Sequence, residues 1–152
     1  MNKHDIKDKL YKACEVDIEK RIQSIQEVLR SVEESRNNET KSSAGDKYET
    51  GRSIMQMEEE KNRNQLFQTN QVRLALKKID PQKKSDKVES GSLVETTSGN
   101  YFISTGIGKV KIEDQLYYCV SSNSPIGRRM MNKVRGEEVE FNGIKLVIRE
   151  IY

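Results

Sequence analysis

The chain has 152 residues, which is enough for one compact domain or two small units. Hydrophobic residues make up 34% and charged residues another 34%, above the usual charged share of about 25%, so much of the chain is expected to lie outside a deep core. The net charge of only +3 argues against a binder of bulk polyanions, and the lack of a long apolar stretch predicts a soluble, unexported protein with no membrane partner. The two cysteines show no pairing pattern, which predicts a cytoplasmic location.

Residues 1–80 are predicted to form an antiparallel hairpin of two long helices. Residues 1–79 contain no proline and only two glycines, and the steps from Ile18 to Leu29 have the 4, 3, 4 spacing of a coiled-coil seam. The polar run 35–45 is expected to be a loop, which places the hairpin tip at about residues 36–49. The arms on either side are similar in length, and a short loop between such helices favours antiparallel packing.

The apolar pattern of the second helix, expected from about Asp46 to Ile79, is sparse. Ile54, Met55 and Met57 are predicted to face the first helix early in this segment, followed near its end by Val72, Leu76 and Ile79. The residues between them, 58–65, are almost wholly polar, which weakens the prediction of tight packing there. The same periodicity fits a coiled coil that joins two chains, and the sequence leaves this alternative open.

The period changes after Asp80-Pro81, where the second helix is predicted to end because a residue before proline disfavours helical geometry. A linker is expected at residues 81–87. Short strands are predicted at 93–96, 101–104, 116–120, 138–141 and 144–148. Asn142-Gly143 is typical of a two-residue hairpin turn, and Ser124 and Pro125 are suited to begin one short helix. The predicted fold class is α+β, with the helical hairpin followed by a small antiparallel sheet and one short helix at 88–152.

Few residues of the sequence suit self-contained catalysis. His4 is the only histidine and lies near the N-terminal end, so a Ser-His or Cys-His nucleophile is not expected. Cys14 and Cys119 fall in different segments and are predicted to be reduced, small apolar residues rather than zinc ligands. Gly106-Ile107-Gly108 lacks the rest of a dinucleotide-binding motif. We therefore do not expect an enzyme.

Two acidic residues near the predicted start of the second helix have two interpretations. Asp46 and Glu49 are three positions apart, so both project from one side of the first helical turn. They suit a capping box, in which Asp46 caps the helix and Glu49 reaches back to its amide. They also suit half of a Mg²⁺ site, because this ion prefers oxygen ligands and is often held by one or two carboxylates. Such a pair would need further ligands from a partner and would hold no metal alone.

The order of these parts resembles the Gre transcript-cleavage factors (GreA and GreB), bacterial proteins that enter the secondary channel of RNA polymerase. Residues 121–133 are similar to the family's strand-to-helix segment S-x-N-S-P-[LI]-[GA]-R-A-L, and 136–140 and 148–152 are similar to its later strands. The resemblance covers residues 88–152 and implies an FKBP-like domain that docks to the polymerase. It implies contacts with the polymerase from Asn123, Ser124, Pro125, Ile126, Arg128 and Arg129. For the two arginines, simple cover of the short helix is an equal alternative.

The segment Gly45-Asp46-Lys47-Tyr48-Glu49 is similar to the family's tip motif G-D-x-x-E. In the family the two acids bring a second Mg²⁺ to the polymerase active site, where backtracked RNA is hydrolysed. The resemblance implies that Asp46 and Glu49 direct a Mg²⁺ shared with the polymerase. After Glu49 the chain departs from the family's N-A-E-Y-x-x-A-[KR]-E-E, and Gly51 loosens the helix start by about 1 kcal/mol relative to alanine. This departure favours the alternative of a channel-binding regulator or inhibitor without cleavage.

A basic cluster follows the second helix, and it too has two interpretations. It is a solvated junction, or a patch near RNA that would act through phosphate charge. Its members are Lys77, Lys78, Lys83, Lys84 and Lys87. Any contact with the RNA 3′ end or the DNA template is expected only through the polymerase. We expect a monomer; the alternative from another class is an adaptor that dimerises through the seam at 18–32.

Overall fold

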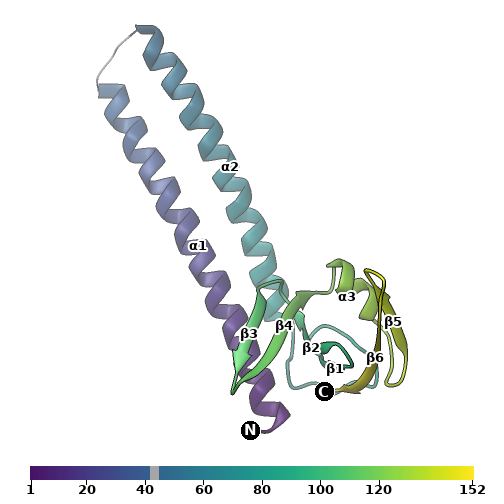
Figure 1. Cartoon of the computed structure of the whole chain (residues 1–152). Coiled ribbons are helices and arrows are strands. Elements are labelled where there is room, and N and C mark those ends of the chain that lie inside the picture. Colours follow the sequence, from purple (N-terminus) through teal and green to yellow (C-terminus); the bar gives the residue numbers. More distant parts are fainter. Residues whose placement is uncertain (42–44) are drawn as a thin grey trace. The chain divides into compact units, whose positions relative to one another are not determined.

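Both long helices are present in the computed structural model, which describes the backbone of residues 1–41 and 45–152 and the side chains of residues 1–38 and 50–152. Helix α1 covers Lys3–Lys41 and helix α2 covers Gly45–Lys77, and the two run side by side in opposite directions (Figure 1). By its internal contacts the chain divides into two units. One consists of Met1–Asp17 with Ala75–Tyr152, and the other consists of Ile18–Leu74, so each helix contributes to both.

In the unit Ile18–Leu74 the two helices bury a narrow seam between them. On α1 the seam contains Ile18, Ile22 and Val32, which are 1%, 4% and 7% exposed, as the 4, 3, 4 spacing predicted. The predicted loop at 35–45 is wrong over residues 35–41, where α1 continues, and at Gly45, where α2 begins. Its residues 42–44 lie outside the described residues. This polar run contains no glycine or proline before residue 45, and Arg36 gains an ion-pair partner on α2 by remaining helical.

The seam of α2 differs from the one predicted. Ile54 and Met57 are 60% and 69% exposed, whereas Met55 is partly buried. The inner positions of α2 continue from Met55 through Glu59 and Asn62, at steps of four and three residues. Apolar residues alone predicted the wrong face for Ile54 and Met57, because polar side chains occupy the inner positions in this part of α2.

The other unit contains a six-stranded sheet and a short helix, so the predicted α+β class is confirmed. The strands are β1 (Leu93–Thr96), β2 (Gly99–Ser104), β3 (Gly108–Ile112), β4 (Gln115–Ser121), β5 (Glu138–Phe141) and β6 (Ile144–Ile151), and helix α3 covers Pro125–Met130. The strand order is β3-β4-β2-β1-β6-β5. The predicted turn is confirmed, since Asn142 and Gly143 have φ of 52° and 76° between β5 and β6.

The sheet is mixed rather than purely antiparallel, because β2 and β4 pair in parallel. The cause is strand β3, which the sequence analysis missed. After β2 the chain crosses to the edge of the sheet, forms β3 there, and returns as β4 between β3 and β2. Strand β3 has exposed lysines at positions 109 and 111 and no fully buried residue, so its apolar signal is weak.

The sheet has a buried core on one face and the start of α1 on the other. The first face carries Val94, Ile103 and Ile148 in one cluster with Met130 of α3. Successive strand residues point to opposite faces, so Leu93 and Phe102, both fully buried, belong to the second face. There the Cys14 sulfur of α1 lies 3.2 Å from the Ser104 hydroxyl of β2.

Polar contacts also join the start of α1 to the end of the sheet and of α2. Lys7 is 3% exposed, and its ammonium group donates to the Tyr152 carbonyl at 2.9 Å. The Tyr11 hydroxyl donates to the Leu76 carbonyl at 2.7 Å. Burial of Lys7 lowers the pKa of its ammonium group. These contacts fix the first turns of α1 within the sheet-containing unit. In the described part of the chain, no helix combines the length and hydropathy that crossing a membrane requires.

Candidate functional site

The segment that joins β4 to α3 is held by a compact set of hydrogen bonds. The Ser124 hydroxyl donates to the Ser121 carbonyl at 2.6 Å and accepts from the Gly127 amide at 3.1 Å, so Ser124 is the helix cap that the sequence predicted. The backbone amide of Asn123 donates to the Ser121 hydroxyl at 3.1 Å. Pro125 occupies the first turn of α3, where a missing amide proton costs nothing.

Gly127 is required by the close approach of α3 to the preceding strand. A Cβ atom at this position would lie 2.0 Å from the Ser121 carbonyl oxygen and 2.9 Å from the Ser124 hydroxyl. Gly127 is buried, and Met130 one turn later is fully buried in the core. The segment is therefore a rigid turn whose backbone is fixed by packing on one side.

The six predicted docking residues separate into two groups in this turn. Ser124 and Ile126 are half-buried, Ser124 as the cap and Ile126 packed against the core. The other four side chains are exposed and available to a partner: Asn123, Pro125, Arg128 and Arg129. The fixed backbone of this turn thus presents the adjacent guanidinium groups of Arg128 and Arg129 and the side-chain amide of Asn123. This arrangement is suited to an acidic protein surface.

Asp46 and Glu49 both lie in the first turns of α2, which begins at Gly45. Their side chains lie outside the described residues, so the predicted Mg²⁺ pair stays a prediction. In the parts of the chain whose side chains are described, no group of three or more His, Cys, Asp or Glu residues is placed to hold a metal ion.

The predicted basic cluster lies at the end of α2 and in the turns after it. Lys77 is the last residue of the helix, and Lys78 donates its amide to the Ala75 carbonyl in a final tight turn. Lys83 and Lys84 follow Pro81 and are exposed, as are Lys77 and Lys78. The Lys83 ammonium lies 3.3 Å from the Glu89 carboxylate, which offsets part of the positive charge. The cluster remains compatible with both predicted interpretations.

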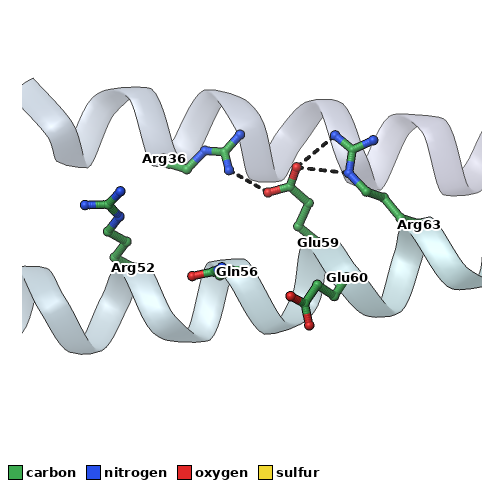
Figure 2. Close-up of a pocket in the computed structure, with 6 residues that line it drawn as sticks. All are labelled: Arg36, Arg52, Gln56, Glu59, Glu60 and Arg63. Atoms are coloured by element: carbon green, nitrogen blue, oxygen red, sulfur yellow. Dashed lines mark hydrogen bonds and ion pairs between the residues drawn. The ribbon is translucent and has the colours of Figure 1, made fainter.

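A second charged group, which the sequence analysis missed, lies between the two helices in the unit Ile18–Leu74. The Glu59 carboxylate of α2 accepts from Arg36 of α1 at 2.6 Å and from two nitrogens of Arg63 at 2.8 and 3.1 Å (Figure 2). These residues line a cavity of about 310 Å³ together with Arg52, Gln56 and Glu60. Glu59 lies four residues after Met55, but its polar side chain adds nothing to an apolar period, so the sequence pattern alone did not indicate this group.

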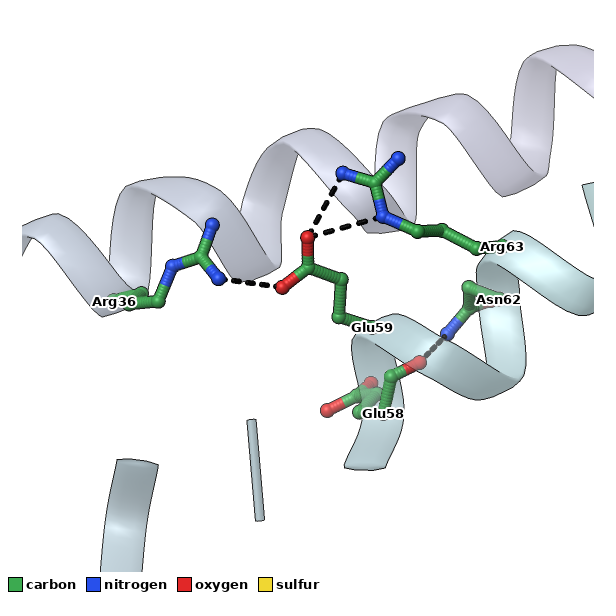
Figure 3. A network of polar contacts seen from close by, with 5 residues as sticks. All are labelled: Arg36, Glu58, Glu59, Asn62 and Arg63. Atoms are coloured by element: carbon green, nitrogen blue, oxygen red, sulfur yellow. Dashed lines mark hydrogen bonds and ion pairs between the residues drawn. The ribbon is translucent and has the colours of Figure 1, made fainter. Parts of the chain in front are cut away.

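The surroundings of Glu59 favour its charged form. Hydrogen bonds from Arg63, and the positive charges of Arg36 and Arg63, hold the pKa of the Glu59 carboxyl below its ordinary value. One turn away, the Asn62 side-chain amide donates to the Glu58 carbonyl at 2.9 Å, so a second polar residue of the inner face is bonded to its own helix (Figure 3). The ion pair of Arg36 with Glu59 thus joins α1 and α2 at a part of the seam where the neighbouring inner position of α2 is polar as well.

Two free cysteines meet at the second face of the sheet. Cys14 is fully buried and Cys119 is 1% exposed. The neighbouring Cys119 thiol, followed by the hydroxyls of Ser104 and Thr105, outweighs burial and lowers the pKa of Cys14 to about 6. In turn, the hydrogen bond with Cys14, together with burial, raises the pKa of the Cys119 thiol. No sequence pattern indicated this pairing, because the two thiols lie in segments far apart along the chain.

No family model matches the chain, and no curated protein shows a significant match to it.

Proposed function

We propose that this chain is a Gre-like factor that binds RNA polymerase at its secondary channel and stimulates hydrolysis of backtracked RNA by the polymerase's own active site. The single observation that carries the proposal is the turn at 121–133, where Ser124 and Gly127 fix the backbone and Arg128 and Arg129 are exposed. The motif similarity implies that this turn docks, and the burial of its residues separates the supporting side chains from the exposed ones.

In this proposal the exposed side of the turn docks on the polymerase. Arg128 and Arg129 would pair with carboxylates, and Asn123 would add a hydrogen bond beside them. Charged groups at the rim of an interface act mainly on partner choice and association rate. Ser124 and Gly127 would contribute indirectly, since they hold the two arginines in place without contacting the partner.

The length of α2 separates the two acids from the basic cluster. The helix has 33 residues, which at about 1.5 Å per residue makes it roughly 50 Å long. Asp46 and Glu49 lie at its beginning and the basic cluster starts at its end. A helix of this length suits the proposed insertion of two acids into a channel.

Two carboxylates spaced by three residues in one helical turn fit a Mg²⁺ ion that has further ligands in a partner. When bound, the ion would supply charge stabilisation and an activated water for phosphodiester hydrolysis. Asp46 and Glu49 would hold the ion by their carboxylate oxygens and orient it at the RNA. The polymerase would supply the remaining ligands and the substrate, so the chain acts as a cofactor rather than as an enzyme.

The proposal is tested with stalled, backtracked elongation complexes of the cognate polymerase in Mg²⁺ buffer. We expect the wild-type chain to shorten the RNA from its 3′ end and Asp46→Asn/Glu49→Gln to lose this activity. The matched control is Glu33→Gln/Glu34→Gln, which removes two exposed acids from α1 and should cleave normally. Wild-type shortening that survives in Asp46→Asn/Glu49→Gln would contradict the proposed role of the acids, and failure to bind core polymerase would contradict the docking.

A second candidate is a channel-binding regulator without cleavage, favoured by the residues after Glu49. Thr50 and Gly51 replace the expected Asn-Ala of the family motif, and Ile54 is 60% exposed. Binding of the wild-type chain to core polymerase, with no RNA shortening in the same assay, would select this candidate. The adaptor alternative has less support, because Ile18 and Ile22 are already buried within one chain.

A further inference from the structure

We propose that Cys14 and Cys119 form a redox-sensitive pair, in which a peroxide converts the two thiols into a disulfide that ties the first turns of α1 to strand β4. This inference does not depend on the proposed function. Both thiols are free, both are buried, and they come from segments far apart in the sequence.

The strand register places the two cysteines together. Phe102 lies opposite Cys119 in the parallel β2–β4 pair, and Ser104 lies opposite Ser121. Since alternate residues of a strand share a face, Ser104 and Cys119 are diagonal neighbours on the same face. The Cys14 sulfur lies 3.2 Å from the Ser104 hydroxyl, so α1 holds this thiol over the same part of the sheet.

The surroundings of the thiols are polar although they are buried. Ser104 is hydrogen-bonded to Cys14, whereas the adjacent Thr105 is only 5% exposed and its hydroxyl has no conventional hydrogen-bond partner among the described residues. A buried hydroxyl without a partner costs free energy, and an anionic sulfur is an acceptor that such a donor can stabilise. The hydroxyls of Ser104 and Thr105 therefore favour a thiolate at Cys14.

The chemistry of the pair follows from this thiolate. The Cys14 thiolate attacks one oxygen of hydrogen peroxide, the O–O bond breaks, and after proton uptake a sulfenic acid and one water are formed. The Cys119 sulfur then attacks the Cys14 sulfur and loses its proton, and the sulfenic oxygen leaves as a second water. In total, two thiols and one hydrogen peroxide give one disulfide and two waters.

The disulfide would connect residues 14 and 119 and enclose both long helices and strands β1–β3 in one covalent loop. A loop of this length restricts the unfolded chain strongly and so raises stability. Cys119 also lies two residues before Ser121, whose carbonyl anchors the cap of α3. Oxidation would thus hold the start of α1 on the strand that leads into the exposed turn.

The test uses the full chain at low concentration, with graded hydrogen peroxide followed by alkylation and intact mass measurement without reductant. We expect a mass lower by two hydrogen atoms per chain and a cross-linked peptide containing Cys14 and Cys119. The thermal midpoint should rise by several degrees, and dithiothreitol should return it to the value of the reduced chain. Thiols that stay reduced, disulfides between chains, or cysteines oxidised to sulfinic acid without a cross-link would each overturn the proposal.

The matched variants are Cys119→Ala and Cys14→Ala, each compared before and after peroxide. We expect neither to gain thermal stability on oxidation, and Cys119→Ala to accumulate sulfenic acid at Cys14 that dimedone traps. Should either variant unfold, the wild-type chain supplies an independent measure in mixtures of oxidised and reduced dithiothreitol. There, a single two-electron transition between the folded dithiol and the folded disulfide is expected, and its absence would contradict the inference.

Discussion

The Arg36 guanidinium of α1 lies 2.6 Å from the Glu59 carboxylate of α2, and this ion pair joins the two helices where apolar packing is sparse. Glu59 is also bound by Arg63 from its own helix, at i,i+4 spacing. The carboxylate is therefore shared between two guanidinium groups, and its side chain is 15% exposed. Loss of this one carboxylate would leave two cations facing each other across the seam.

The ion pair of Glu59 predicts a pH-dependent contribution to stability. Its pKa is lowered in the folded state from an ordinary value of 4.5, so the folded chain binds fewer protons than the unfolded chain as the pH falls. The stabilising contribution of the Glu59 ion pair is present above about pH 4.5, and it is lost as the pH falls through the pKa that Glu59 has in the folded chain. We expect Glu59→Gln to melt at a lower temperature than the wild type at pH 7, with the difference closing near pH 3. Thermal unfolding followed by circular dichroism measures the difference between the two melting temperatures at each pH.

The control for this series is Glu60→Gln, the adjacent acid, which is exposed. It should shift the melting temperature little at any pH. A Glu59→Gln deficit that is equally large at pH 7 and pH 3 would show that the ion pair is not its source.

Gly127→Ala should destabilise the sheet-containing unit by about 2–3 kcal/mol or more, because the new Cβ would meet the Ser121 carbonyl at 2.0 Å and neither backbone can move freely. Urea unfolding followed by circular dichroism measures the change. Gly106→Ala is the control, since a Cβ added there would meet nothing within 4 Å, and it should cost no more than about 0.5 kcal/mol. Equal stability of the two variants would rule out the proposed steric reason for Gly127.

Removing the Tyr11 hydroxyl should weaken the attachment of α1 to the end of α2. The hydroxyl donates to the Leu76 carbonyl at 2.7 Å, and Leu76 is 2% exposed, so few waters can replace the lost donor. We expect Tyr11→Phe to lower the free energy of unfolding by about 1 kcal/mol. Tyr118→Phe keeps the ring that stacks on Tyr101 at 5.4 Å and should be nearly neutral. A neutral Tyr11→Phe would mean that the hydrogen bond contributes nothing in solution.

Charge reversal on the exposed side of α3 tests the proposed docking. Arg128→Glu/Arg129→Glu should weaken binding to core polymerase by about tenfold or more, and the loss should shrink at high salt because screening reduces the repulsion. Binding is measured by surface plasmon resonance at two salt concentrations. Arg149→Glu changes an exposed arginine of β6 outside the docking motif and serves as the control. If both variants lose affinity to the same extent, the effect comes from net charge and not from the turn.

Much of the fold was predictable because local signals and packing agree. The seam residues of α1, the cap at Ser124 and the turn at Asn142-Gly143 each combine a suitable residue type with a matching pattern of neighbours. Strand β3 was missed because it is an edge strand whose lysines face solvent. Because β3 lies between β2 and β4 in the chain and pairs antiparallel with β4, β4 runs parallel to β2. Without β3, the sequence could not predict the topology of this half of the sheet.

The candidate site was predictable only where the chain brings its residues together locally. Arg128 and Arg129 are neighbours in the sequence, and their exposure follows from the burial of Gly127 and Met130 on the other side of α3. The group around Glu59 needed the register between the two helices, and polar seam residues provide no apolar period from which to read it. The contact of Cys14 with Ser104 spans 90 positions and needed the complete topology.

Strand β1 has a position in the sheet that governs when the unit can form during synthesis. Its partners are β2, which follows at once, and β6, which is made only after residues 97–143. Lys7 at the other end of the chain also requires its partner at Tyr152. Until residues 144–151 have left the ribosome, β1 exposes an unpaired edge and the helix start has no complete surface to bind. The nascent chain must therefore keep this incomplete sheet from associating with other chains while residues 97–143 and then β6 are being made.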